Sequence, residues 1–339
     1  MAKDPLKILL LFDLGQAPPE NQDYTEILKT EKDWEGEAKL VRALKNLGYE
    51  VRMFGLFDSI VPLFDVIHSY KPDLVFNQCE ALRTDRNHEP HIVGLLQMLN
   101  VKYTGADPVA LQICKDKGLT KKILSYHRIR IPQFAISKKT SPIRKLRKFS
   151  YPAFSKPLML EGSVGISQVS FTENEKDTID RVRFIHESLE TDAIVEEYIE
   201  GRELYVGIIG NDRLKVFPPR ELSFSEVPEG EPKFATFKAK WDDNYRKKWG
   251  IKSGPAKNLA PSLEKKISEV CKKIYKLCEI RGYARIDLRL TAKDEIVFIE
   301  ANPNPSIAWD EDFALAAKEA GLDYEALIDQ IIHLALQAS

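Results

Sequence analysis

Hydrophobic and polar positions in the first third of the chain follow two alternating patterns. Continuous apolar runs at Lys7–Phe12 and Leu74–Asn77 are typical of strands buried in a parallel sheet. Between them, Glu35–Leu47 has apolar residues at helical spacing, and Gly48 follows as a stop signal. Strands that alternate with helices in this way predict a parallel sheet with crossover connections. We expect one α/β domain over residues 1–117.

The pattern changes after residue 117. Strand-like runs at Tyr151–Leu158 and Ser167–Phe171 flank a segment rich in Gly and Ser. A helical pattern over Asp177–Leu189 then precedes a strong strand at Ala193–Ile199. These elements predict a small α+β domain over residues 118–199.

Residues 200–339 again mix strands and helices. A helical pattern over Leu263–Arg281 precedes two strands, Ala284–Leu290 and Ile296–Ala301, whose short connection predicts a hairpin. The stretch Ser223–Pro261 has few periodic signals, so we expect a long loop there. The sequence thus predicts a third domain of the α+β class after the α/β domain and the small central one.

Composition narrows the functional classes. The 339 residues include 50 Lys and Arg against 51 Asp and Glu, so a protein that binds nucleic acid through bulk charge is not expected. No apolar run approaches the roughly 18–20 residues of a membrane span, and the first residues do not resemble a signal peptide. The four cysteines form no CxxC pair, which favours buried free thiols over a zinc site. We expect a cytoplasmic protein with neither a nucleic-acid nor a membrane partner.

The strongest chemical signal lies in the predicted hairpin. Side chains alternate across a strand, so Arg285, Asp287 and Arg289 share one face of its first strand. Glu300 and Asn302 share one face of its second strand. If these faces coincide, two carboxylates and an amide oxygen converge beside an arginine, which is a ligand set that suits Mg²⁺. A solvated, salt-bridged strand face is the alternative.

Two further segments suit a nucleotide, although G-x-G-x-x-G and P-loop motifs are both missing from the sequence. Lys156 ends a predicted strand and precedes Gly162–Ser167, where backbone N–H groups can face phosphate oxygens. Val195–Glu203 runs from an apolar strand into acidic residues and a Gly turn, which can contact an adenine edge and a ribose. Each segment, taken alone, also suits an ordinary loop or strand end.

The order and spacing of these motifs resemble the ATP-grasp superfamily and, within it, the D-alanine–D-alanine ligases. The resemblance extends from Asp73 to the C-terminus and implies an ATP-grasp fold. It also implies that Phe237–Lys240 is a mobile loop whose lysine covers the γ-phosphate. The residues that it assigns to ATP are Lys117, Lys156, Ser163, Val164, Gly165, Glu196, Glu197, Tyr198, Ile199, Glu203 and Lys240.

The resemblance implies a reaction as well. A substrate carboxylate attacks the γ-phosphate of ATP, and an amine then attacks the acyl phosphate to leave an amide, ADP and phosphate. Two Mg²⁺ ions, for which Mn²⁺ can substitute, would be held by Asp287, Glu300 and Asn302. Catalytic roles fall to Arg285, Lys240 and Ser306. Family members commonly pair through their N-terminal regions, so a homodimer is expected.

The match weakens at the amino-acid pocket. Gly162 precedes Ser163 where the ligases carry two serines, and Trp241 follows Lys240. The ligases bind the second substrate's carboxylate with a Ser-Leu pair, but here the corresponding stretch, Ala308–Asp312, is acidic and suits an amine or another cation. The residues expected near the substrates are Glu31, Glu89, Trp241 and Glu311.

These observations predict an ATP-dependent carboxylate–amine ligase. Its substrates are small molecules of the amino-acid class, and they need not be two D-alanines. One alternative is a true D-alanine–D-alanine ligase of cell-wall synthesis with a remodelled pocket. A non-catalytic ATP-binding protein and an ATP-grasp kinase are further alternatives.

Overall fold

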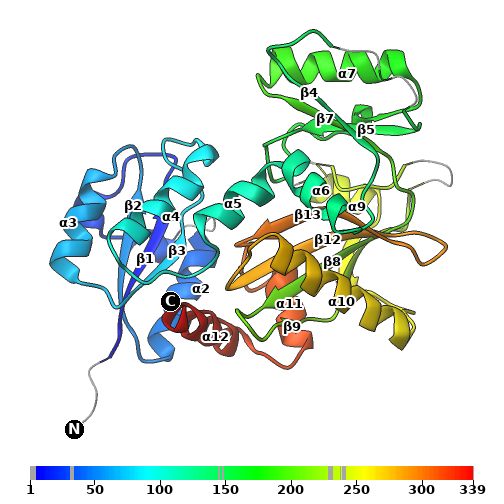
Figure 1. The fold of residues 1–339 in the computed structure, drawn as a ribbon. Helices are drawn as coiled ribbons and strands as arrows, with labels where there is room; N and C mark the ends of the chain where they lie inside the picture. Colours follow the sequence, from blue (N-terminus) through cyan, green and yellow to red (C-terminus); the bar gives the residue numbers. More distant parts are fainter. Residues whose placement is uncertain are drawn as a thin grey trace.

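The computed structural model describes residues 5–30, 34–143, 146, 149–227, 232–236, 238 and 242–338. Over these residues the chain folds into three β-sheets with helices packed around them (Figure 1). The sheets follow one another along the sequence, and the mixed α/β and α+β class predicted from the sequence is confirmed.

The first sheet is parallel and has the strand order β2-β1-β3. Its central strand β1 is an apolar run that is almost entirely buried, as expected for a strand covered on both faces. The strands are β1 (Lys7–Asp13), β2 (Glu50–Leu56) and β3 (Leu74–Gln78). The helices of this part are α1 (Ile27–Thr30), α2 (Glu35–Asn46), α3 (Val61–Tyr70) and α4 (Glu89–Met98), with short 3₁₀ turns η1 (Glu20–Gln22) and η3 (Arg86–His88).

Two helices lead from this sheet to the next. They are α5 (Pro108–Lys115) and α6 (Lys117–Tyr126). The sequence pattern did not predict α5, which begins with Pro108 at its first position. Helix α6 begins where Asp116 accepts hydrogen bonds from the backbone N–H groups of Gly118 and Leu119, at 3.0 and 2.9 Å.

The second sheet is antiparallel and has the strand order β4-β7-β5-β6, with α7 packed on it (green in Figure 1). Its elements are β4 (Phe134–Ser137), β5 (Ala153–Pro157), η4 (Gln168–Ser170), β6 (Phe171–Thr172), α7 (Glu175–Ser188) and β7 (Ala193–Glu197). The strand predicted over Ser167–Phe171 is therefore wrong for most of its length. A 3₁₀ turn forms instead, because Ser167 and Ser170 cap one another's backbone.

The third sheet has the order β11-β10-β8-β12-β13, and β9 also pairs with β8. Its strands are β8 (Arg202–Ile209), β9 (Lys215–Val216), β10 (Arg220–Phe224), β11 (Ile251–Pro255), β12 (Tyr283–Leu290) and β13 (Ile296–Pro303). The helices are α9 (Asp243–Lys248), α10 (Pro261–Leu277), α11 (Asp312–Glu319) and α12 (Tyr324–Gln337). The long loop expected over Ser223–Pro261 is only partly correct, because β10 and β11 pair with each other across it.

The cores show how these sheets are joined. The first and third sheets share buried clusters: Leu9 and Val75 belong to the same cluster as Val206 and Ile274. Helix α12 packs against α2, although these elements lie at opposite ends of the chain (Figure 1). The second sheet has a small core of its own, formed by Ala153, Val182, Ile185, Ala193 and Val195.

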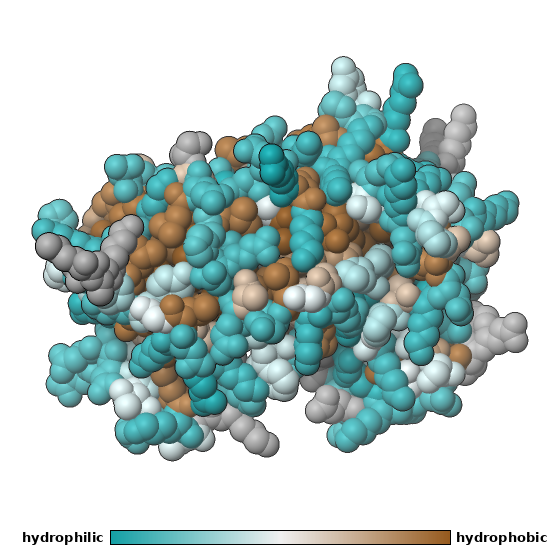
Figure 2. All heavy atoms as spheres, turned by 90° about the horizontal axis from the view of Figure 1, so that it is seen from below, coloured by the Kyte–Doolittle hydropathy of each residue, from teal (hydrophilic) through white to brown (hydrophobic). Residues whose placement is uncertain are grey.

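The four cysteines are free and buried, as the sequence predicted. Figure 2 shows a face of the molecule on which apolar areas lie between hydrophilic side chains. Among the described residues, no helix is both long enough and apolar enough to span a membrane.

Candidate nucleotide and metal site

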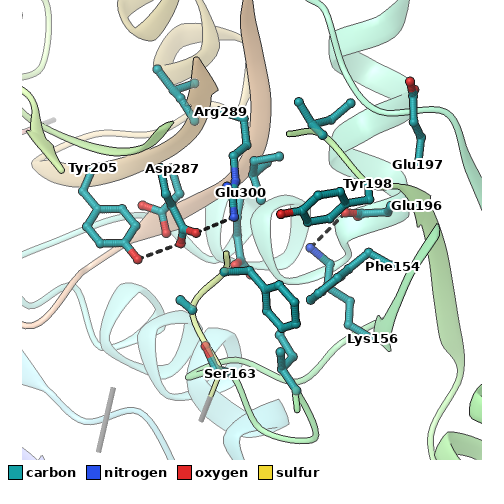
Figure 3. A pocket seen from close by; sticks show the side chains of 17 residues that line it. Phe154, Lys156, Ser163, Glu196, Glu197, Tyr198, Tyr205, Asp287, Arg289 and Glu300 are labelled. Atoms are coloured by element: carbon teal, nitrogen blue, oxygen red, sulfur yellow. Dashed lines mark hydrogen bonds and ion pairs between the residues drawn. The ribbon is translucent and has the colours of Figure 1, made fainter. Parts of the chain in front are cut away.

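A pocket lies where the second sheet faces the third. Strands β5 and β7 line it from one side, and β8, β12 and β13 line it from the other (Figure 3). Of the residues expected to bind ATP, it brings together Lys156, Ser163, Glu196, Glu197, Tyr198, Ile199 and Glu203. The expected metal ligands Asp287 and Glu300 line the same pocket.

One end of the pocket is aromatic and apolar. The rings of Phe154 and Phe234 meet edge to face with their centroids 4.8 Å apart, and Tyr198 lies 6.4 Å from Phe234. Leu288 and Ile299 add apolar surface to the lining. Such a slot suits a planar, hydrophobic base.

No sequence motif predicts a role for Phe154 or Phe234. Phe154 lies two residues before Lys156 on β5, so strand alternation could have placed both on one face. Phe234 comes from an irregular segment, and no periodic pattern predicts its position.

Lys156 lies beside the aromatic slot and forms an ion pair with Glu196. The Lys156 Nζ is 3.2 Å from the Glu196 Oε2, and both side chains are buried (Figure 3). Burial by itself lowers the pKa of Lys156, but the carboxylates of Glu196, Glu300 and Glu203 together outweigh burial and raise that pKa. Lys156 is therefore a permanent cation at the pocket wall.

The predicted hairpin of β12 and β13 forms, and its charged faces coincide. Asp287 pairs across the ladder with Glu300, and Arg285 pairs with Asn302. The Arg285 guanidinium donates two hydrogen bonds to the Asp287 carboxylate, at 2.7 and 2.9 Å, and Asn302 Nδ2 donates a third at 3.1 Å. The Asp287 carboxylate raises the pKa of Arg285 against the opposing effect of burial.

This group of oxygen atoms fits a divalent cation. Lys117 Nζ lies 3.2 Å from Glu300 Oε1 and also donates to the Leu160 carbonyl at 2.7 Å. Two carboxylates and one amide oxygen are hard ligands of the kind that Mg²⁺ takes together with phosphate oxygens. Within the part of the chain that the structure describes, no group of three His, Cys, Asp or Glu side chains could hold a metal. Remaining ligands would therefore come from Asn302, water or the nucleotide.

Glu203 is held by two neighbours on the sheet. Arg289 is its cross-strand partner and donates to Glu203 Oε2 at 2.7 Å, while Tyr205 Oη donates to Oε1 at 2.8 Å. Arg289 also donates to the backbone carbonyls of Gly201 and Lys233, each at 2.8 Å. The sequence placed Arg289 on the correct face without giving it a role, and the structure shows that it shapes the pocket.

The glycine-rich segment contributes one of its three expected residues to the pocket. Ser163 lines the pocket with a positive φ of 61°. Gly165 has a φ of 73° and packs on the far side, where an added Cβ would lie 2.5 Å from the Leu189 side chain. Val164 is exposed. Glycine is thus required at position 165 for both conformation and packing.

The expected substrate and catalytic residues are scattered. Glu89 is buried near Lys115, with 3.8 Å between Glu89 Oε2 and Lys115 Nζ, and burial together with Glu161 raises the pKa of Glu89 to about 8. Ser306 and Glu311 are exposed in the segment that follows β13. Lys240, Trp241 and Glu31 lie outside the described residues.

Comparisons with known proteins identify relatives of this chain. A family model described as the D-ala D-ala ligase C-terminus matches residues 113–333. The D-alanine–D-alanine ligase of Aquifex aeolicus is 30% identical over 295 residues, which are 86% of this chain and 92% of that protein. The uncharacterized protein y4sG of Sinorhizobium fredii is 29% identical over 267 residues, covering 77% of this chain and 74% of the relative.

A solved structure supports the fold. The crystal structure of the Bacillus anthracis D-alanine–D-alanine ligase complexed with ATP matches with a TM-score of 0.72 and 19% identity, over 98% of both chains. This fold, the matching family model and the Aquifex relative together define an ATP-dependent ligase of the ATP-grasp class. Within that class, the chain belongs to the D-alanine–D-alanine ligase family.

Proposed function

We propose that this protein joins the carboxylate of one small molecule to the amine of another through an acyl phosphate made from ATP. The pairing of Asp287 with Glu300 across β12 and β13, beside Arg285 and Lys117, carries the proposal. It puts two carboxylates and two cations within one buried site. That charge pattern suits phosphoryl transfer, in which positioning and electrostatic stabilisation do most of the work.

The pocket suggests where each part of ATP lies. The base occupies the slot between Phe154, Tyr198 and Phe234, with the Glu197–Ile199 segment along its edge. The ribose lies near Glu203, and Lys156 and Lys117 face the phosphates. Asp287, Glu300 and Asn302 would hold Mg²⁺ there, and a bound ion would supply positive charge for the phosphate oxygens.

The chain's own residues then serve two steps. Lys156 and Lys117 stabilise the charge that spreads over the transferred phosphoryl group as a substrate carboxylate attacks it. Arg285 is held in place by its two bonds to Asp287, so its remaining N–H groups can support the oxygen that gains charge when the amine attacks. Ser306 lies on the exposed segment after β13 and would contribute through its backbone. Lys240, which lies outside the described residues, is assigned to the γ-phosphate by the resemblance to the ligases.

We further propose that the substrates are amino acids or close analogues and that they need not be two D-alanines. Asp310 and Glu311 are exposed after β13. Partial desolvation and the nearby Asp312 raise the pKa of Glu311. Carboxylates in this place attract an amine or another cation and repel a carboxylate. The resemblance to the ligases also assigns Glu31, Glu89 and Trp241 to the substrates, and of these three only Glu89 lies within the described residues.

A panel of amino acids tests this function. ADP and phosphate release would be measured with ATP and Mg²⁺, and the products identified by mass spectrometry, with D-alanine by itself included. Asp287→Asn serves as the inactive control. An amide product whose formation depends on ATP and Mg²⁺ supports the ligase. ADP release with a phosphorylated product and no amide would instead show a kinase.

The panel also decides the substrate proposal. D-alanyl-D-alanine formed as the preferred product would contradict the view that the acidic segment changes specificity. A different carboxylate–amine pair would support it. ATP binding with no turnover on any pair would favour a non-catalytic ATP-binding protein.

We place the protein in the cytoplasm, where ATP is available and where the four buried free thiols would stay reduced. We also propose that the chain forms a homodimer, which light scattering of the purified protein would test. The domain limits at residues 117 and 199 are likewise proposals. The separate small core formed between Ala153 and Val195 supports a distinct unit in this part of the chain.

A further inference from the structure

Another buried lysine lies behind the nucleotide pocket. Lys121 is on α6, has no exposed surface and does not line the pocket. A lysine without solvent contact is costly unless its charge is paired and its N–H groups are bonded. The partners of Lys121 therefore indicate why it is there.

One partner is Glu196, which Lys121 shares with Lys156. Lys121 Nζ lies 2.9 Å from Glu196 Oε1, and Lys156 Nζ lies 3.2 Å from Glu196 Oε2. One carboxylate thus stands between two ammonium groups, and the three charges sum to a single positive charge. Of the two lysines, Lys156 lines the pocket together with Glu196 and Lys121 does not, so the positive charge next to the nucleotide is that of Lys156.

The other partner is a bulge in β13. In the β12–β13 ladder, Asp287 pairs with Glu300 but Leu288 pairs with Phe298, so Ile299 is the extra residue of the bulge. Lys121 Nζ donates to the Ile299 carbonyl at 2.7 Å, and it lies 5.4 Å from the centroid of the Phe298 ring. Lys121 therefore binds the backbone directly before Glu300.

We propose that Lys121 is a positioning residue, which fixes Glu196 and the β13 bulge so that Lys156 and Glu300 both face the nucleotide. It links α6 to the second sheet through Glu196 and to the third sheet through Ile299. Without it, Glu196 pairs fully with Lys156, and the phosphates must compete with that carboxylate. This inference rests on the proposed role of Lys156 as a phosphate-binding residue.

The test compares Lys121→Met with Lys122→Met, because Lys122 is the next residue on α6 and is exposed. Binding of ATP in the presence of Mg²⁺ would be measured by calorimetry, together with the KM for ATP and kcat. We expect Lys121→Met to weaken ATP binding at least tenfold and to raise the KM for ATP more than it lowers kcat. Lys122→Met should bind ATP as the wild type does.

Two further variants separate an electrostatic role from a structural one. Glu196→Gln removes the shared carboxylate, and the double variant removes both groups. If Lys121 acts mainly through Glu196, adding Lys121→Met to Glu196→Gln should change ATP binding less than threefold. Equal effects in both backgrounds would contradict the part of the proposal that runs through Glu196 and leave only the bulge contact. Lost thermal stability with ATP binding within threefold of the wild type would overturn the proposal.

Different experimental results would contradict the ligase proposal and the proposal for Lys121. ATP binding needs no amide product, so a wild-type chain that binds ATP without ligating anything refutes the ligase and leaves the role of Lys121 testable. Should Lys121→Met fail to fold, the double variant still gives the measurement by comparison with Glu196→Gln, because both chains lack the Glu196 carboxylate and differ only at position 121.

Discussion

The nucleotide pocket and the segment that follows β13 differ in whether their acidic side chains are paired with cations. In the pocket, acidic side chains are paired with buried cations, as Glu196 is with Lys156 and Glu203 with Arg289. After β13, Asp312 is tied to Arg220 at 2.8 Å, whereas Asp310 and Glu311 are exposed. The first region is organised for a polyanion, and the second offers negative charge to whatever approaches it.

This difference indicates which of the two regions we expect to be more similar to other members of the family. ATP is the same molecule in every member of an ATP-grasp family, so the chemistry of its pocket leaves little freedom. The carboxylate and amine substrates can differ, and the acidic segment after β13 is where this chain departs from the ligase pattern. Variants on the two sides should therefore affect different kinetic constants.

The largest effect is expected from Asp287→Asn. This change removes a carboxylate from the Mg²⁺ set and one partner of Arg285, so kcat should fall by about 10³-fold or more. Steady-state ADP release measures it, with circular dichroism to check folding. Asp294→Asn is the matched control, since Asp294 lies on the exposed turn of the same hairpin. If Asp287→Asn keeps activity within tenfold of the wild type, Asp287 is not a ligand of Mg²⁺.

A second variant tests whether the paired charges stabilise the pocket. Arg289→Met leaves Glu203 buried without its cation, so the free energy of unfolding should fall by about 3–5 kcal/mol. Arg202→Met breaks a more exposed pair with Glu221 on the same sheet and should cost less than about 1 kcal/mol. Urea unfolding of both variants gives the comparison. If both variants lose the same free energy of unfolding, burial does not make the Arg289–Glu203 pair more stabilising than the Arg202–Glu221 pair.

Glu89 gives a pH-dependent test on the side expected for the first substrate. Its folded pKa, about 8, lies above its usual value of 4.5, so between these pH values the native state holds a proton that the unfolded state has lost. Glu89 therefore makes the protein less stable as the pH rises through this window. Replacing it by Gln should raise stability relative to wild type by roughly 1–3 kcal/mol more at pH 8 than at pH 5. Urea unfolding at both pH values measures this difference.

Glu187→Gln is the control for that experiment, because Glu187 is exposed on α7. It should leave the pH dependence of unfolding as in the wild type. If the free energy of unfolding of Glu89→Gln also depends on pH as that of the wild type does, Glu89 is ionised throughout the range from pH 5 to pH 8.

The smallest effect is expected on the acidic segment. Glu311→Gln should raise the KM for the amine substrate about tenfold and leave the KM for ATP unchanged, because an ionic contact is worth on the order of 1.4 kcal/mol here. Glu264→Gln, on the exposed face of α10, serves as the control. If the KM for ATP changes instead, the acidic segment does not act on the amine substrate separately from the nucleotide pocket, and the proposal is contradicted.

Much of the fold was predictable because its signals are local. The apolar run of β1, the helical spacing of α2 and the hairpin of β12 and β13 were all predicted from neighbouring residues. Helix α5 and the paired strands β10 and β11 were missed. Leu222 and Ile251 contact each other across a long stretch without a periodic pattern, and their burial against Tyr205 makes those strands stable.

In the candidate site, too, some features could be predicted from local sequence and others could not. Strand alternation by itself placed Arg285, Asp287 and Arg289 on one face, and Glu300 and Asn302 on another. That the two faces coincide depends on the register of the ladder, which only the folded sheet determines. Phe234 and Lys121 reach the site from segments that no local pattern connects to it.

The sequence by itself therefore determined which residues could carry the chemistry, because side-chain alternation is a property of each strand. The tertiary structure decided which of them meet. It packed the second sheet against the third, formed the bulge at Ile299 and paired Glu203 with Arg289. These contacts join segments far apart in the chain, and burial decides them, because a buried charge must find its partner wherever the fold provides one.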